Sequence, residues 1–139
     1  MRSRVALEEL KRLEDFLRPS WIAIVGTIGP SGMAQLTPNW YSFSDGKLHV
    51  STTKQRVKYR NLVRDGRLSV CVVSEPRGQN YASITGLADI RDDESIWIET
   101  RDIVERYVEP GRVESWIADL QKQDRVIISL KPERIVLSC

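Results

Sequence analysis

Seven short segments with the residue pattern of β-strands dominate this 139-residue chain and leave little room for long helices. Some alternate apolar and polar residues, others are short apolar runs, and turn-forming residues such as Gly and Pro separate several of them. Strands at such short spacing favour an antiparallel, barrel-like sheet over a parallel doubly wound one. The seven predicted strands are residues 21–28, 33–43, 47–53, 67–74, 81–90, 125–130 and 134–137.

Four helices are predicted around these strands. Leu7, Leu10, Leu13 and Leu17 recur at helical spacing in a charged background, and Pro19 ends that amphipathic helix. Similar periods predict helices over residues 56–65, 94–108 and 113–120. A chain of this length can bury the core of one domain. We therefore predict a single domain over residues 1–139, mainly β with peripheral helices.

Charge is segregated along the chain. The net charge of +2 is too small to indicate general nucleic-acid binding. Residues 54–67 hold six cations and one acid, whereas residues 89–109 hold eight acids and three arginines. A basic patch that is local suits a small anionic ligand better than a long polyanion, so we expect no nucleic-acid partner.

The cysteines and the hydropathy pattern indicate the compartment. Cys71 and Cys139 provide neither a disulfide framework nor a zinc spacing. Charged residues interrupt the N-terminal segment, and no apolar run approaches membrane-spanning length. These features predict a cytoplasmic protein with no membrane partner.

No pattern of catalytic or metal-binding side chains emerges. His49 is the only histidine and lies in the middle of a predicted strand without a ligand partner, and Cys71 lies in an apolar run typical of buried residues. The glycines of residues 26–32 suit a hairpin turn, since no Gly-Lys-Ser/Thr follows. Trp97 and Trp116 fall on apolar helix faces and are interpreted as core residues. We predict no catalytic side chain and no metal site.

Residues 51–62 form the segment most indicative of function. A strand delivers the hydroxyls of Ser51, Thr52 and Thr53 to the start of a short helix, where Arg56 and Lys58 add positive charge. Free backbone N–H groups in the first helical turn also favour an anion. The pattern therefore predicts an anion-binding cradle, while a solvated basic helix face remains the alternative.

Residues 35–40 are unusual for a strand because Pro38 interrupts good strand formers. Proline has no N–H to donate to a neighbouring strand, so this strand is predicted to lie at a sheet edge or to bulge. Backbone groups left free there could meet a ligand, and an ordinary edge strand is the alternative.

Together these residues resemble the split β-barrel flavin and deazaflavin proteins related to pyridoxamine 5′-phosphate oxidase. The resemblance extends from Trp21 to Leu137. Its parts are residues 21–27, the turn 29–32, the strand 35–40, the cradle 51–62, the strand 81–89 and the closing residues 125–137. It implies a homodimeric split antiparallel β-barrel.

The resemblance also implies roles for individual residues. Arg56 and Lys58 would hold the phosphate of a cofactor, and Tyr81 would contact it from the second subunit. Supporting contacts would come from Ser51, Thr52, Thr53 and Asn61, and the strand lining the tricyclic ring would contribute Gln35, Thr37, Pro38, Asn39 and Trp40.

The form Arg-x-Lys-x-x-Asn-Leu at residues 56–62 resembles the branch that uses the deazaflavin coenzyme F420. The implied function is an oxidoreductase that transfers hydride from F420 to a conjugated small molecule. An FMN enzyme of the same fold, or a flavin or F420 carrier or sensor, is the alternative. The chain shows no Trp and Arg-rich C-terminal segment of the kind that pyridoxamine phosphate oxidases use for their substrate, so we expect a different substrate.

Overall fold

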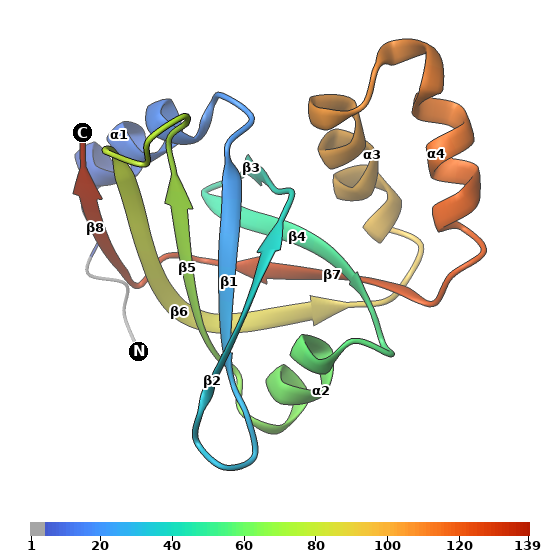
Figure 1. Ribbon diagram of the computed structural model, residues 1–139, viewed down its shortest axis with the longest axis horizontal. Coiled ribbons are helices and arrows are strands. Elements are labelled where there is room, and N and C mark those ends of the chain that lie inside the picture. The colour runs from blue at the N-terminus through green and yellow to red at the C-terminus, as the bar shows by residue number, and fades with distance from the viewer. Residues whose placement is uncertain (1–4) are drawn as a thin grey trace.

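Eight strands form one strongly curled sheet in the computed structural model, which describes residues 5–139 (Figure 1). The strand order is β2-β1-β5-β6-β7-β4-β3, β8 pairs with β6, and every pairing is antiparallel. The predicted mainly β, barrel-like fold with peripheral helices is confirmed. The strands are β1 Ile22–Ile28, β2 Ala34–Asn39, β3 Ser42–Ser44, β4 Lys47–Thr53, β5 Arg67–Val73, β6 Tyr81–Arg91, β7 Arg125–Leu130 and β8 Arg134–Ser138.

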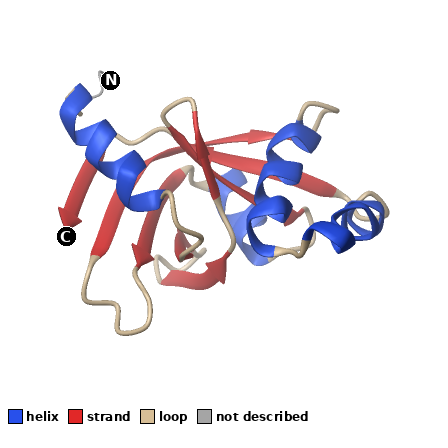
Figure 2. Ribbon diagram, turned by 90° about the horizontal axis from the view of Figure 1, so that it is seen from above, coloured by secondary structure: helices blue, strands red, loops and turns tan. Residues whose placement is uncertain are grey.

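The helices cover the open sides of this sheet. They are α1 Leu7–Leu17, α2 Val57–Arg64, α3 Ile96–Tyr107 and α4 Val113–Leu120, with a short 3-10 turn at Pro110–Arg112. Leu13 and Leu17 of α1 are buried in the main core with the inward side chains of the strands, and Figure 2 shows α1 crossing one face of the sheet. Within residues 5–139, none of the helices is long and apolar enough to span a bilayer.

One predicted strand, residues 33–43, is wrong because the chain breaks there into β2 and β3. β2 pairs with β1, whereas β3 pairs with β4 in the other half of the barrel. The break follows Pro38, and Tyr41 is fully buried beside it with its hydroxyl 2.8 Å from the Leu17 carbonyl oxygen. Burying that ring requires the chain to turn inward, so a continuous ladder is impossible. The predicted edge position of Pro38 is confirmed, since β2 ends the strand order.

The long strand β6 joins the two halves of the barrel. Its first part pairs with β5 and β8, and residues from Ala88 onward pair with β7. The strand curves where it changes partners (Figure 1). Gly86 lies at this point, and a Cβ atom there would stand 2.8 Å from the Lys131 carbonyl oxygen and 2.9 Å from Leu130 Cδ1. Only a residue without a side chain lets the two halves approach this closely.

Replacing Gly86 with alanine should therefore destabilise the protein. We expect Gly86→Ala to lower the free energy of unfolding by about 1–3 kcal/mol, because backbone must move to relieve the overlap. Urea unfolding followed by tryptophan fluorescence measures this. Gly111→Ala is the control, since no atom of residues 5–139 outside its immediate neighbours lies within 4 Å of a Cβ at that position. Equal stability of the two variants would contradict the proposed crowding.

Candidate anion-binding cavity

A cavity of about 560 Å³ lies where β2, β4 and the start of α2 face α3 and α4. Its volume is in the range that holds a small-molecule cofactor. The lining combines cations and hydroxyls with an equal number of apolar and aromatic side chains, and no Asp or Glu is among these described residues. They are Ile22, Thr37, Pro38, Asn39, Trp40, Ser51, Thr52, Arg56, Lys58, Thr100, Ile103, Val104, Trp116, Leu120 and Arg125.

Three cations, Arg56, Lys58 and Arg125, meet at this cavity. Lys58 is only 6 % exposed, and burial together with the nearby Arg56 and Arg125 charges lowers the pKa of its ammonium group. The pKa of Arg125 is also lowered, first by burial and then by Arg56. Neighbouring like charges in a partly buried site are unfavourable unless an anion joins them.

The remaining cations of the basic segment have partners within the protein. Lys54 binds Asp92 at 2.9 Å, Arg67 binds Asp65 at 2.8 Å, Arg60 donates to the Gln55 carbonyl at 2.7 Å and Arg64 donates to the Ile28 carbonyl at 2.6 Å. Within residues 5–139, the side chains of Arg56 and Lys58 make no hydrogen bond or ion pair. The basic segment therefore divides into cations that stabilise the fold and two that face the cavity.

The local backbone adds donors at the same place. β4 ends at Thr53, the Arg56 N–H donates to the Thr53 carbonyl at 3.1 Å, and α2 begins at Val57. Arg56 has extended φ and ψ angles of −78° and 148°, and no side chain in the described part of the chain caps the helix. First-turn N–H groups of a helix have no intrahelical acceptor, so they reinforce the positive potential there.

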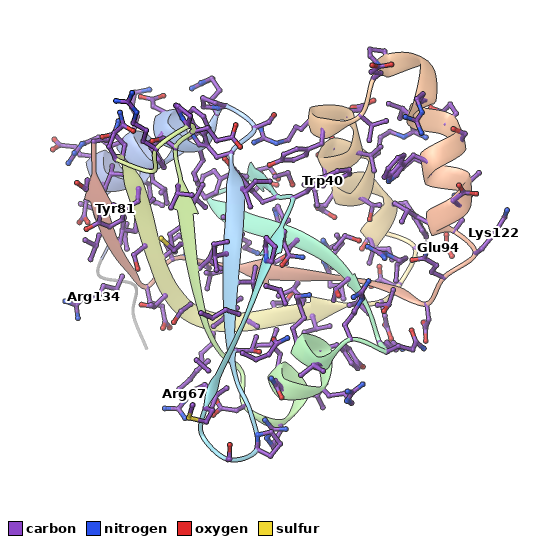
Figure 3. All side chains as sticks on the ribbon, in the orientation of Figure 1. Trp40, Arg67, Tyr81, Glu94, Lys122 and Arg134 are labelled. Atoms are coloured by element: carbon purple, nitrogen blue, oxygen red, sulfur yellow. The ribbon has the colours of Figure 1, made fainter. Side chains whose placement is uncertain are left out.

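An apolar wall completes the cavity. Trp40 stacks on Tyr107 of α3 with ring centroids 5.0 Å apart and lies 5.6 Å from the Trp116 ring of α4. Figure 3 shows Trp40 between the sheet and these helices. Trp116 belongs to a small core shared by α3 and α4, as predicted, but it also lines the cavity, which the sequence interpretation did not foresee.

The structure brings most of the predicted site residues together. Eight line the cavity: Thr37, Pro38, Asn39, Trp40, Ser51, Thr52, Arg56 and Lys58. Four do not: Gln35, Thr53, Asn61 and Tyr81. The buried Asn61 amide donates to Thr27 Oγ1 at 3.0 Å, and that hydroxyl donates to Gln35 Oε1 at 3.3 Å. This chain of hydrogen bonds ties α2 to β1 and β2.

Tyr81 lies far from the cavity in its own chain. It begins β6 on the side of the molecule opposite Trp40 and the α3–α4 pair (Figure 3). Its predicted contact from a second subunit stays a prediction. The residues that sequence reasoning missed are Ile22, Arg125 and the α3–α4 residues of the lining, because only strand pairing and helix packing bring them to the cradle.

His49 and Cys71 do not line the cavity. His49 is buried, with Nδ1 2.7 Å from Ser129 Oγ and Nε2 3.1 Å from Ser44 Oγ, and burial lowers its pKa. Burial also raises the pKa of the Cys71 thiol. The His49 contacts tie β4 to β7 and β3, which is a structural role. No group of three His, Cys, Asp or Glu side chains among residues 5–139 is arranged to hold a metal.

The sequence profile of the pyridoxamine 5′-phosphate oxidase family matches residues 10–139. The chain belongs to this family. Solved structures agree with this assignment. An F420 reductase is 25 % identical with a TM-score of 0.69, and the match covers 88 % of this chain and 94 % of the reductase. A conserved hypothetical protein of Mycobacterium tuberculosis is 25 % identical with a TM-score of 0.76, covering 97 % and 88 % of the two chains.

The family includes oxidoreductases and its fold holds flavin-type cofactors. A haem-binding protein of Mycobacterium smegmatis shares the fold at 14 % identity with a TM-score of 0.69, covering 99 % of this chain and 55 % of that protein. No curated protein matches the sequence. The split β-barrel is thus the architecture of this family member, and the choice of cofactor depends on its own cavity.

Proposed function

We propose that this family member binds F420 through the cationic part of the cavity and is an oxidoreductase that transfers hydride to a conjugated small molecule. The observation that carries the proposal is Lys58, a buried ammonium group with two arginines beside it and no carboxylate among the described residues that line the cavity. A phosphate ester supplies the missing negative charge. FMN is the alternative cofactor, because it presents a phosphate on a similar linker.

The cavity residues fit such a cofactor at both ends. Arg56, Lys58 and the hydroxyls of Ser51 and Thr52 would hold the phosphate, and residues 37–40 with the α3–α4 wall would flank the ring. The bound cofactor would supply the hydride chemistry. The protein would fix the phosphate, orient the ring beside β2 and exclude water with the apolar wall. We assign no side chain a covalent role.

F420 is favoured over FMN by the form of residues 56–62 and by the F420 reductase among the similar structures. A second candidate function is a carrier or sensor that binds the cofactor without turnover. It is supported by the haem-binding protein of the same fold, since that fold serves binding proteins as well. Turnover separates the two functions.

Parallel titration of the apo-protein with F420, FMN, FAD and haem tests the proposal. We expect F420 to bind most tightly, and the phosphate-free deazaflavin core of F420 to bind much more weakly. Oxidation of reduced F420 by a quinone under anaerobic conditions then distinguishes an enzyme from a carrier. Failure of both F420 and FMN to bind would overturn the proposed function.

We further propose that a second copy of the chain covers the outer face of the sheet. By strand register this face carries Leu36, Pro38, Ile22, Ile24, Ser69, Cys71, Val73, Tyr81, Ser83, Thr85 and Val136. The same register places Arg67 and Arg134 at one end of this face, opposite Leu87 and Thr85. The rest of the face is uncharged, and Leu36 and Val136 are 64 % and 46 % exposed. Exposed apolar patches with a polar rim are characteristic of interfaces. Ile22 and Pro38 also line the cavity, so a partner here would border the cofactor.

A charge placed on this face should break the homodimer. We expect the parent to be a dimer by light scattering and Val136→Glu to be largely monomeric, because burying a carboxylate in an interface is unfavourable. Ile98→Glu is the control, since Ile98 is 66 % exposed on α3 away from this face. A monomeric parent that binds cofactor tightly would disprove the shared site, including the role of Tyr81.

A further inference from the structure

We propose that Arg125 is a third phosphate-binding residue and that Ser51 positions it. This inference rests on the proposed function and deepens it, because it adds a ligand from β7 to a cradle otherwise built from β4 and α2. The expected ligand group is the phosphate ester of the cofactor.

Arg125 is fixed beside the cradle by the backbone. It is the first residue of β7 and lies opposite Thr53, the last residue of β4. The Lys54 N–H donates to the Asp124 carbonyl at 3.1 Å, so the turn after β4 and the start of β7 are joined. The position of the Arg125 backbone therefore follows that of the cradle itself.

The Arg125 guanidinium is held but not neutralised. Its Nε and Nη2 atoms donate to Ser51 Oγ at 3.2 and 2.8 Å, and Nη1 donates to Gln123 Oε1 at 2.8 Å. A guanidinium has five N–H donors, so two remain after these three bonds. Within the described chain it has no carboxylate partner. It faces the cavity with fixed orientation, full charge and free donors.

Ser51 gains a defined role from the same contacts. A hydroxyl has two acceptor lone pairs and one donor. Both Arg125 bonds end on Ser51 Oγ, so the hydroxyl hydrogen must point to another group. Because Ser51 lines the cavity, that group is the phosphate when the cofactor is present. Ser51 would thus orient Arg125 and donate to the same anion.

The ratio of the dissociation constants of the phosphate-free and phosphate-bearing forms of one cofactor tests this role. The pairs are riboflavin with FMN, and the deazaflavin core with F420. We expect Arg125→Gln to lower this ratio at least about tenfold and to leave phosphate-free binding within about twofold of the parent. Ser51→Ala should lower it about threefold to tenfold, and Ser51→Thr should restore most of the loss.

Arg67→Gln is the matched control. It also replaces an arginine with glutamine, but Arg67 is paired with Asp65 at the surface and does not line the cavity. It should leave the ratio unchanged. Arg125→Lys keeps the positive charge but loses the planar set of guanidinium donors. We expect its ratio to lie between those of the parent and Arg125→Gln. Inorganic phosphate should raise the melting temperature of the parent and of Arg67→Gln, but much less that of Arg125→Gln.

The outcomes separate this inference from the proposed function. A parent that binds neither cofactor, or shows no preference for the phosphate-bearing form, overturns both. A parent with a clear preference that Arg125→Gln retains overturns only the role of Arg125. Arg125→Gln and Arg125→Lys could instead weaken the binding of the phosphate-free and the phosphate-bearing form equally. Arg125 would then be a structural residue, and its proposed role in phosphate binding would be overturned.

Discussion

Lys58→Met is expected to make the cofactor-free protein more stable and its binding of F420 or FMN at least about tenfold weaker. Lys58 is buried, and the pKa of its ammonium group is lowered by burial and by Arg56 and Arg125. Methionine keeps the apolar stem and removes this charge. We therefore expect a gain of about 1 kcal/mol in the free energy of unfolding, together with loss of a charged phosphate contact.

The stability gain should depend on pH. A lysine whose pKa is lowered in the folded state binds fewer protons there than in the unfolded chain, so the stability of the parent rises as pH rises through the lowered value. The gain from Lys58→Met is consequently largest near neutral pH and shrinks toward the ordinary lysine range. Urea unfolding at several pH values measures it.

Lys54→Met is the control for both effects. Lys54 lies in the same basic segment but binds Asp92 at 2.9 Å and does not line the cavity. Its replacement should change cofactor affinity less than about twofold and bring no stability gain. If Lys58→Met binds F420 and FMN as tightly as the parent and the Lys54→Met control do, the assignment of the cradle is wrong.

Among half-buried side chains, we expect Arg106 to contribute most to stability, so Arg106→Met should be strongly destabilising. The Arg106 guanidinium donates to the carbonyls of Tyr41 at 2.9 Å, Arg18 at 3.1 Å, Pro19 at 3.1 Å and Leu17 at 3.2 Å. It also lies 4.8 Å over the Tyr41 ring. These contacts fasten α3 to the end of α1 and to the break between β2 and β3.

Removing the guanidinium takes one donor from each of these four carbonyls. Those of Leu17 and Pro19 keep the Tyr41 hydroxyl as a donor, whereas those of Tyr41 and Arg18 lose the Arg106 donor without this replacement. We expect the free energy of unfolding to fall by about 2–4 kcal/mol, which thermal denaturation would show as a clearly lower melting temperature. Arg112→Met is the control, because Arg112 is exposed and contacts mainly the Trp116 ring, at 5.7 Å. Similar melting temperatures for the two variants would contradict the fastening role of Arg106.

The cofactor should respond to the same change. The α3–α4 pair supplies the apolar wall of the cavity, so loosening α3 should weaken binding of the cofactor ring more than binding of inorganic phosphate. Measuring the affinities of Arg106→Met for the cofactor and for inorganic phosphate would show whether the ring site or the phosphate site is affected.

Most secondary-structure elements follow from local residue patterns, because hydropathy period, prolines and glycines act over a few residues. The segments 47–53 and 125–130 were predicted with the bounds that the structure shows. That Arg56 and Lys58 line one cavity was predictable for a related reason. Arg56 and Lys58 are two residues apart at the start of one helix, so their convergence needs no tertiary information.

The residues that complete the cavity depend on long-range packing. Arg125 is 67 positions after Lys58 and joins it because β7 pairs with β4, a register that no local pattern specifies. Asn61 and Gln35 meet at Thr27 inside the barrel instead of lining the cavity. Burial of Tyr41 divides one predicted strand into two. Each outcome depends on which distant surfaces pack together, because long-range burial and pairing outweigh local preference.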